Sequence, residues 1–181
     1  MKSISLTLLK AALTVALVVL IGLSGPASAL AQTNVAVLPG LKGVFAGSQP
    51  ADLGVKDGLL TGCPPSPNCV VSQGADEDHA IAPIRYSTDR ATAQQNLVDI
   101  LGVVPRTQVI QQQDGYILAE SESRLMGFVD DSEFYFPAAE KVIQLRAAAR
   151  LGESDLGVNR RRLEQIRLAL EDLEQRAAVR L

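Results

Sequence analysis

Hydrophobic and polar residues alternate along the stretch between Val103 and Arg150, and this period of two predicts β-strands. Turn signals divide the stretch into four strands, expected at 106–113, 116–124, 127–136 and 141–150. Asp114-Gly115, between the first two, is typical of a two-residue β-hairpin. Because all the connections are short, we expect the strands to form an antiparallel meander.

Two amphipathic helices are predicted to flank these strands. The first follows Ser87-Thr88-Asp89-Arg90, which offers an N-cap, and Gly102 is expected to end it. Its apolar positions recur at helical spacing: Ala93, Leu97, Ile100 and Leu101.

The second helix is longer and opens near Val158 or Asn159. A single apolar stripe runs along it: Leu163, Ile166, Leu170, Leu173 and Ala177. We expect the stripe to pack on one face of the sheet, although its spacing also fits a coiled-coil seam. The predicted fold class is therefore α+β, a four-stranded antiparallel meander flanked by an N-terminal and a long C-terminal helix.

The first thirty or so residues predict a removable signal peptide. A basic start is followed by an apolar run from Ala11 to Leu23, shorter than the roughly 20 residues that a membrane-spanning helix needs. Small-x-small sites predict a mature chain that begins at Leu30 or, preferably, at Gln32. Cleavage would leave no permanent membrane anchor, and the alternative is an uncleaved N-terminal anchor.

Removal of residues 1–31 leaves 150 of the 181 residues, enough for one domain. Residues 32–62 are rich in Gly and Pro and predict an N-terminal arm, and residues 63–181 predict a single α+β domain. Loss of Lys2 and Lys10 leaves 15 basic and 20 acidic residues, a net charge of −5. This balance gives no electrostatic footprint for nucleic acid or for an anionic membrane surface.

The two cysteines, Cys63 and Cys69, close a short proline-rich loop. In an oxidising compartment we expect them to form a disulfide. A sharper alternative adds His79 and an acid from 76–78 to make a four-ligand metal site, although the spacing is not a known zinc pattern. A redox-active dithiol is a further alternative that lacks the Cys-x-x-Cys spacing.

Pairing of the last two predicted strands places charged residues on one sheet face and mostly apolar residues on the other. A four-residue turn at 137–140 puts Phe136 opposite Lys141. Counting back gives the rest of the expected register: Asp131 opposite Arg146, Glu133 opposite Gln144, Phe134 opposite Ile143 and Asp130 opposite Ala147. Asp130 then falls on the apolar face, where an unpaired carboxylate is costly.

Three outcomes are open for Asp130. A β-bulge rotates the carboxylate outward, or a buried donor, such as an arginine from the C-terminal helix, satisfies it. In the functional alternative, Asp130 lines a pocket left open by Ala147, Ala148 and Ala149, with Ser132 nearby.

The segment 150–162 gathers four arginines and two acids around two glycines, where a strand is expected to turn into the long helix. The N-terminus of that helix is a candidate anion site. In the structural alternative, Asp155 or Asn159 caps the helix, Glu153 pairs with an arginine, and the arginines at 160–162 are mostly solvated.

Motifs of the common catalytic classes are missing from the sequence. It contains no nucleophile elbow, no phosphate-binding glycine loop and no His-rich metal motif, and we expect no cofactor. His79 is the one histidine and hence the one candidate for histidine-based acid–base catalysis.

Four segments together resemble the exported and plastid-type proteins of the family called domain of unknown function 1499. They are Cys63–Val70, then His79 with Ile81 and Pro83, then Gly127–Phe134, and finally Gly152–Arg160. The resemblance implies a photosynthetic bacterial or plastid-like setting and no particular activity. In the family pattern serines are usual between the positions of Arg146 and Arg150, where this chain has only alanines, so a serine nucleophile is not indicated there.

The leading hypothesis is a non-enzymatic exported domain, in the periplasm, the thylakoid lumen or the medium, that binds a protein or small ligand. Binding is expected through the sheet face and the turn at 150–160, with these candidate residues: Asp130, Asp131, Glu133, Arg146, Arg150, Glu153, Asp155, Asn159 and Arg160. One alternative is a hydrolase-like enzyme in which Asp130, Asp131 or Glu133 acts with Arg146 and Arg150 on an anionic or glycosidic substrate. The other is a structural subunit that docks through its C-terminal helix.

Overall fold

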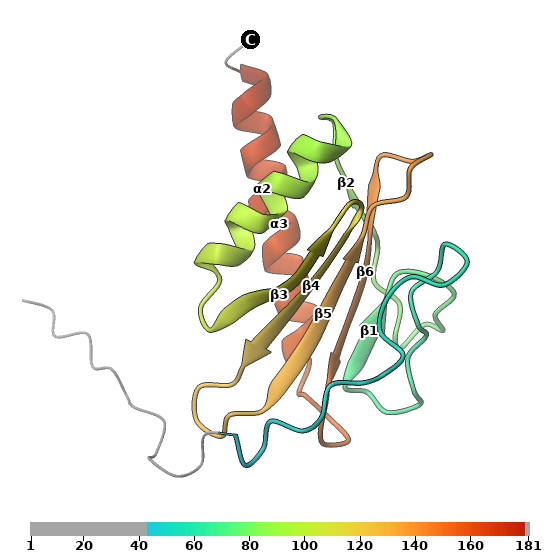
Figure 1. Cartoon of the computed structure of the whole chain (residues 1–181), viewed down its shortest axis with the longest axis vertical. Helices are drawn as coiled ribbons and strands as arrows, with labels where there is room; N and C mark the ends of the chain where they lie inside the picture. The colour runs from blue at the N-terminus through green and yellow to red at the C-terminus, as the bar shows by residue number, and fades with distance from the viewer. Residues whose placement is uncertain (1–42, 180–181) are drawn as a thin grey trace, which may run out of the picture. The chain divides into compact units, whose positions relative to one another are not determined.

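The computed structural model describes residues 43–179 and confirms the α+β class (Figure 1). Its strands are β1 (Cys69–Val71), β2 (Ile84–Arg85), β3 (Thr107–Gln113), β4 (Tyr116–Glu122), β5 (Val129–Tyr135) and β6 (Val142–Ala149). Its helices are α2 (Arg90–Val103) and α3 (Val158–Val179). The predicted signal peptide and the first part of the predicted arm lie outside the described residues.

The strands form one antiparallel sheet in the order β1-β6-β5-β4-β3, and β2 pairs with the first residues of β6. The predicted meander is the part from β3 to β6, joined by short connections. Strands β1 and β2 were not predicted because they are three and two residues long, too short to display a period. Within residues 43–179 no helix is long and apolar enough to span a membrane.

Helix α2 begins where the sequence predicts and ends one residue later. Asp89 is the N-cap, and its carboxylate accepts a hydrogen bond from the backbone N–H of Thr92 at 3.0 Å. The prediction that Gly102 ends the helix is wrong by one residue. The helix continues through Val103, because the Val104 N–H still reaches the carbonyls of Ile100 and Leu101.

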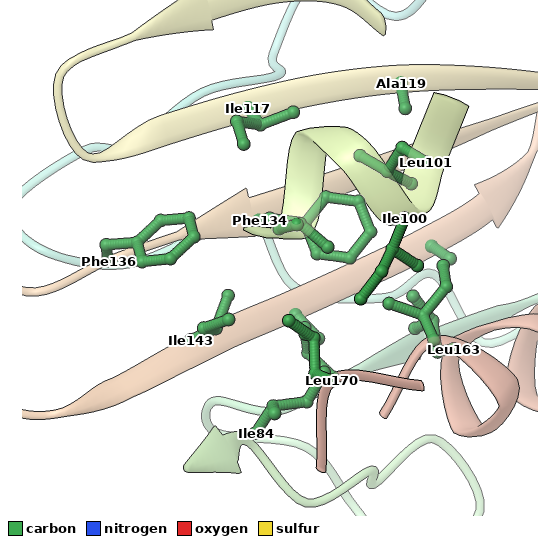
Figure 2. Packing of buried hydrophobic residues seen from close by; sticks show 14 of the residues in the cluster. Ile84, Ile100, Leu101, Ile117, Ala119, Phe134, Phe136, Ile143, Leu163 and Leu170 are labelled. Carbon is green, nitrogen blue, oxygen red and sulfur yellow. The ribbon is translucent and has the colours of Figure 1, made fainter. Parts of the chain in front are cut away.

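One face of the sheet carries the hydrophobic core and is covered by α2 and α3 (Figures 1 and 2). Phe134 and Phe136 from the β5 region pack there with Ile143 on β6, and all three are fully buried. The predicted stripe of α3 packs into the same core through Leu163, Ile166 and Leu170. Leu173 is 39 % exposed, and the side chain of Ala177 is outside the described part.

The opposite face of the sheet is covered by the arm, which is described from Gly43 to Gly62. Leu53, Val55 and Leu60 of the arm pack in a second hydrophobic cluster with Tyr116 and Leu118 of β4. Burial of these apolar side chains holds the arm on the sheet although it forms no strand of the sheet. Neither face of the sheet is therefore left open over its centre.

The predicted β5–β6 register is wrong by two residues. Glu133 lies opposite Arg146 rather than Gln144, and Asp130 lies opposite Ala149 rather than Ala147. Every other expected pair shifts likewise: Asp131 pairs with Ala148, Phe134 with Leu145, and Phe136 does not face Lys141. The β5–β6 pairing ends at Tyr135 opposite Gln144, and the next residue, Phe136, donates its N–H to the carbonyl of Gly115.

A shift of two residues keeps each side chain on its predicted face, because the side-chain period of a strand is two. Asp130 and Phe134 therefore lie on the helix-covered face as predicted, and Asp131 and Glu133 lie on the other. What changes is the residue of β6 that lies opposite each charged residue of β5.

Cys63 and Cys69 form the predicted disulfide, with their Cα atoms 5.6 Å apart. It joins the arm to the first residue of β1. We expect the double variant Cys63→Ala/Cys69→Ala to lose about 2 kcal/mol of unfolding free energy, because the unfolded chain loses a closed loop of seven residues. Urea denaturation with and without a reducing agent measures this.

In reducing agent, the wild-type midpoint should fall to that of the double variant, and the variant should not respond. A wild-type midpoint that is unchanged after verified reduction would contradict this expectation.

Candidate functional site

A buried carboxylate on the arm-covered face, Glu133, accepts hydrogen bonds from three different parts of the chain. Its Oε1 accepts from the Gly54 N–H at 2.7 Å and from the Tyr116 hydroxyl at 2.8 Å. Its Oε2 accepts from Nη1 of Arg146 at 3.1 Å. Glu133 is fully buried and Arg146 is 5 % exposed. Burial and the adjacent Glu133 carboxylate raise the pKa of the Tyr116 hydroxyl.

A second ion pair lies beside the first on the same face. Arg150 donates through Nε and Nη2 to both carboxylate oxygens of Asp131, at 2.8 and 2.7 Å. The same guanidinium also pairs with Glu120. Hydrogen bonding to Asp131 raises the pKa of the Arg150 guanidinium. These bidentate contacts and the low exposure of both groups make this a structural network.

The charged residues of the predicted enzyme cleft are consequently divided between two faces of the sheet. Asp131, Glu133, Arg146 and Arg150 lie together beneath the arm, whereas Asp130 lies on the helix-covered face. The sheet separates Asp130 from the other four.

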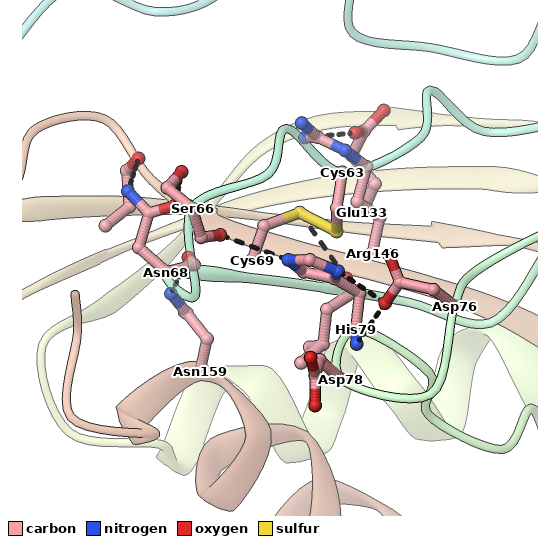
Figure 3. Close-up of a disulfide and its surroundings, with 12 residues drawn as sticks. Cys63, Ser66, Asn68, Cys69, Asp76, Asp78, His79, Glu133, Arg146 and Asn159 are labelled. Atoms are coloured by element: carbon pink, nitrogen blue, oxygen red, sulfur yellow. Dashed lines mark hydrogen bonds and ion pairs between the residues drawn. A yellow bond between two sulfur atoms is a disulfide. The ribbon is translucent and has the colours of Figure 1, made fainter. Parts of the chain in front are cut away.

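The disulfide loop is braced by polar contacts with α3 and with the loop around His79 (Figure 3). The Asn159 side chain, 1 % exposed, donates to the carbonyl of Asn68 at 3.3 Å. Arg160 donates to the backbone carbonyls of Ala80 and Asp78. Asn159 and Arg160, both predicted as ligand contacts, therefore hold the structure together in the described chain.

His79 is buried beside the disulfide loop and has polar neighbours at both ring nitrogens. Its Nδ1 lies 2.7 Å from a carboxylate oxygen of Asp76, and its Nε2 lies 3.2 Å from the carbonyl of Ser66 (Figure 3). Hydrogen bonding to Asp76 raises the pKa of His79. The four-ligand metal alternative is contradicted, because the cysteine sulfurs are joined to each other.

The start of α3 is capped as in the structural alternative. The Asp155 carboxylate accepts hydrogen bonds from the backbone N–H groups of Gly157 and Asn159, at 2.9 and 2.7 Å. Glu153 is exposed, and among residues 43–179 it forms no ion pair, so its predicted pairing with an arginine is wrong.

Asp130 is paired with an arginine of the C-terminal helix, the second of its predicted outcomes. Nη2 of Arg162 donates to its Oδ2 at 2.9 Å, and Nη1 of Arg162 donates to the Asn159 side chain at 2.8 Å. Burial raises the pKa of Asp130, and Arg162 partly opposes this increase. Asp130 and Ala149 also line a cavity, and the lining of this cavity does not include Ala147, Ala148 or Ser132.

Two adjoining hollows lie beside this ion pair. The first, the arginine hollow, has a volume of about 400 Å³ and lies between α3 and the loops on either side of β3 and β4. It is lined by Arg106, Glu122, Ser123, Arg124, Arg161 and Arg162, among others. Four arginines and one glutamate thus line this hollow.

The second, the apolar hollow, has a volume of about 260 Å³ and lies between the ends of β5 and β6 and the start of α3. Its lining includes Phe128, Asp130, Ala149, Leu151, Leu156 and Val158. Ser123 and Val158 line both hollows, so the two adjoin. We call the two hollows together the cleft, with an arginine-lined half and a largely apolar half.

The backbone at this cleft adopts unusual conformations. Three non-glycine residues among 43–179 have a left-handed backbone, and two of them, Arg106 (φ 56°) and Leu156 (φ 55°), line the cleft. For a bulky residue such as leucine this conformation is strained. Strained residues of this kind concentrate at ligand-binding sites.

The arginines of the cleft were not predicted as a site because Arg106, Arg124 and Arg161 come from two loops and a helix far apart in the sequence. Each looks like an ordinary surface arginine in its own segment. The one local signal is the group of four arginines and two acids within 150–162, for which the expected anion site was the N-terminus of the helix. The pairing of the strands in the sheet is what brings these segments together in space.

A family model described as "Protein of unknown function (DUF1499)" matches residues 59–170, which is more than half of the chain. The chain belongs to the DUF1499 family. Neither the curated proteins nor the solved structures contain a match to it. The DUF1499 region includes every residue that lines the two hollows and ends within α3. The part of the arm that contains Gly54, a donor to Glu133, precedes the DUF1499 region.

Proposed function

We propose that this DUF1499 protein is a non-enzymatic binding module that holds a small amphipathic anion in the cleft. The observation that carries the proposal is that the arginine hollow and the apolar hollow adjoin along Ser123 and Val158. Guanidinium groups form paired hydrogen bonds with carboxylate, sulfonate and phosphate oxygens. An apolar tail gains free energy when it leaves water for the apolar half.

The size and the charge of the cleft support such a ligand. Its hollows, at about 400 and 260 Å³, are of the size that holds small molecules. Arg124 makes no hydrogen bond within the described chain, and Arg161 donates only to the backbone carbonyl of Leu156. Their remaining donors are therefore available to an anionic head group, while Arg162 is engaged with Asp130.

Export of the protein is part of the proposal. The Cys63–Cys69 disulfide is compatible with an oxidising compartment outside the cytoplasm. An enzyme that uses Asp131 or Glu133 with Arg146 and Arg150 is not proposed, because these side chains are paired with one another and poorly exposed beneath the arm, and Asp130 lies on the other face of the sheet.

Titration with octanesulfonate tests the binding function, because this probe has a permanently anionic head and an eight-carbon tail. We expect saturable binding that perturbs the amide NMR signals of Ser123, Leu156 and Val158. The variant Arg124→Gln/Arg161→Gln should bind about tenfold more weakly, because each lost charge-assisted contact weakens the head-group site.

Three controls make this result specific. Ethanesulfonate, which lacks the tail, and octyltrimethylammonium, which has the opposite charge, should both bind more weakly than octanesulfonate. Arg176→Gln changes an exposed arginine of α3 outside the cleft and should leave the affinity unchanged. Equal affinity for the anionic and the cationic probe would contradict the proposed function.

A further inference from the structure

The exposed apolar side chains of the protein are concentrated around the mouth of the cleft. Eleven large hydrophobic residues are exposed among the described residues. Six of them lie on the segments that surround the cleft: Val44, Leu125, Met126, Leu151, Leu156 and Val158. Leu156 is 82 % exposed and Leu125 is 64 % exposed. Large apolar side chains that are exposed together mark a surface that contacts a protein, a membrane or a ligand.

Three segments that are distant in the sequence bring these side chains to one end of the sheet. The β4–β5 loop carries Leu125 and Met126, and the β6–α3 loop carries Leu151 and Leu156 (Figure 1). Both loops also contribute to the wall of the apolar hollow. The arm joins them where Phe45 stacks on Phe128, with ring centroids 5.2 Å apart.

Cationic side chains stand among the apolar ones at this end. Arg106, Arg124 and Arg161 are exposed and line the arginine hollow. The acidic groups near them are Glu122 in the hollow and Glu153 on the β6–α3 loop, while Asp130 is paired and Asp155 caps α3. Among these charged side chains, the exposed ones are therefore three arginines and one glutamate, Glu153, whereas Glu122 and Asp155 are half-buried.

We propose that this end of the domain docks on an anionic lipid bilayer, with the two loops inserted into the interface and the cleft open toward the lipid. Apolar side chains on loop tips gain free energy when they enter the boundary between headgroups and acyl chains. Arginines at the same level are attracted by anionic headgroups. The two properties are complementary to a lipid surface in both charge and polarity.

The docked orientation also gives the cleft a source of ligand, a point that rests on the proposed function. An amphipathic anion that leaves the bilayer would keep its tail in the apolar hollow and its head at the arginines. The docking surface itself depends only on the exposed loops and does not require the cleft to be occupied.

Flotation of the chain without its predicted signal peptide, residues 1–31, with lipid vesicles tests this proposal. We expect binding to vesicles of equal parts phosphatidylglycerol and phosphatidylcholine, and weaker binding to phosphatidylcholine alone or at high salt. Leu125→Ser combined with Leu156→Asn should lower the partition coefficient at least about tenfold, because two inserted side chains are lost. Asparagine tolerates the left-handed backbone at position 156, so the variant should fold.

Leu168→Ser is the matched control for Leu125→Ser. Leu168 is 63 % exposed, almost the same as Leu125, but it lies on α3 and not on the inserted loops. It should leave vesicle binding unchanged, and circular dichroism checks that all variants are folded. Failure of the folded wild type to bind the mixed vesicles, or an equal loss for both single variants, would overturn the docking proposal.

The two proposals fail separately. If octanesulfonate binds in the cleft but the protein does not bind vesicles, the docking proposal is wrong and the proposed binding function stands. If vesicles are bound but octanesulfonate is not, docking stands and the proposed ligand class is wrong.

Discussion

Arg146→Met is expected to lower the free energy of unfolding by about 3 kcal/mol, because it leaves the fully buried Glu133 carboxylate without its cation. The Tyr116 hydroxyl and the Gly54 N–H continue to donate to Glu133 and limit the loss. Urea denaturation at neutral pH measures the change. A methionine fills much of the arginine stem's volume, so the loss reports the unpaired charge more than a cavity.

Two further variants separate charge from packing. Glu133→Gln/Arg146→Met removes both charges and should recover most of the lost stability, which a double-mutant cycle quantifies. Arg176→Met breaks an ion pair with Asp172 in which both side chains are mostly exposed, and it should change stability by less than about 0.5 kcal/mol. If the double variant is no more stable than Arg146→Met, the loss does not arise from the buried charge.

The second large effect is expected at Asp130 and depends on pH. Arg162→Met should cost about 2–3 kcal/mol at neutral pH, because Asp130 loses the guanidinium that offsets its burial. The pKa of Asp130 is already raised by burial and should rise further. A carboxyl whose folded-state pKa exceeds its unfolded value loses stability as the pH rises through the interval between them.

The cost of Arg162→Met should therefore shrink as the pH falls toward 3.8, the ordinary pKa of an aspartic acid, where Asp130 is increasingly protonated. The charged groups that affect the pKa of Asp130 are Arg162 on α3, Asp155 on the loop before α3 and, on the other face of the sheet, Asp131. Urea denaturation across this interval gives the profile, and Asp130→Asn/Arg162→Met should flatten it. A cost that is independent of pH would argue against an ionised Asp130 at this site.

The sequence predicted the side on which each β5 residue lies, because the two-residue period depends on local side-chain pattern alone. That was enough to place Asp130 on the apolar face and to require a donor, which is Arg162. The partner across the strand was not predictable in the same way. The register depends on the length of the β5–β6 connection. The pairing ends at Tyr135 and Gln144, so more residues than the expected four, 137–140, lie between the paired positions.

The local sequence pattern also did not predict that the arm covers the second face of the sheet. Gly54 and Leu60 lie in a Gly- and Pro-rich segment without period, and only their contacts with Glu133 and Tyr116 on the sheet explain their positions. The cleft was not predictable either, because its residues come from separate segments and show no sequence pattern. Arg106 and Arg161 each resemble a solvated surface residue in the sequence, and the sheet and α3 bring them together.

The pairing of β6 has a consequence for the order in which the sheet can be completed. Among the described strands, β6 is the one partner of β1, where Cys69 lies opposite Ala148, and it is also the one partner of β2. Strands β3 to β6 are joined by short connections and can pair with their sequence neighbours. As the chain is synthesised from its N-terminus, β1 and β2 emerge first and have no partner among the described strands until β6 follows.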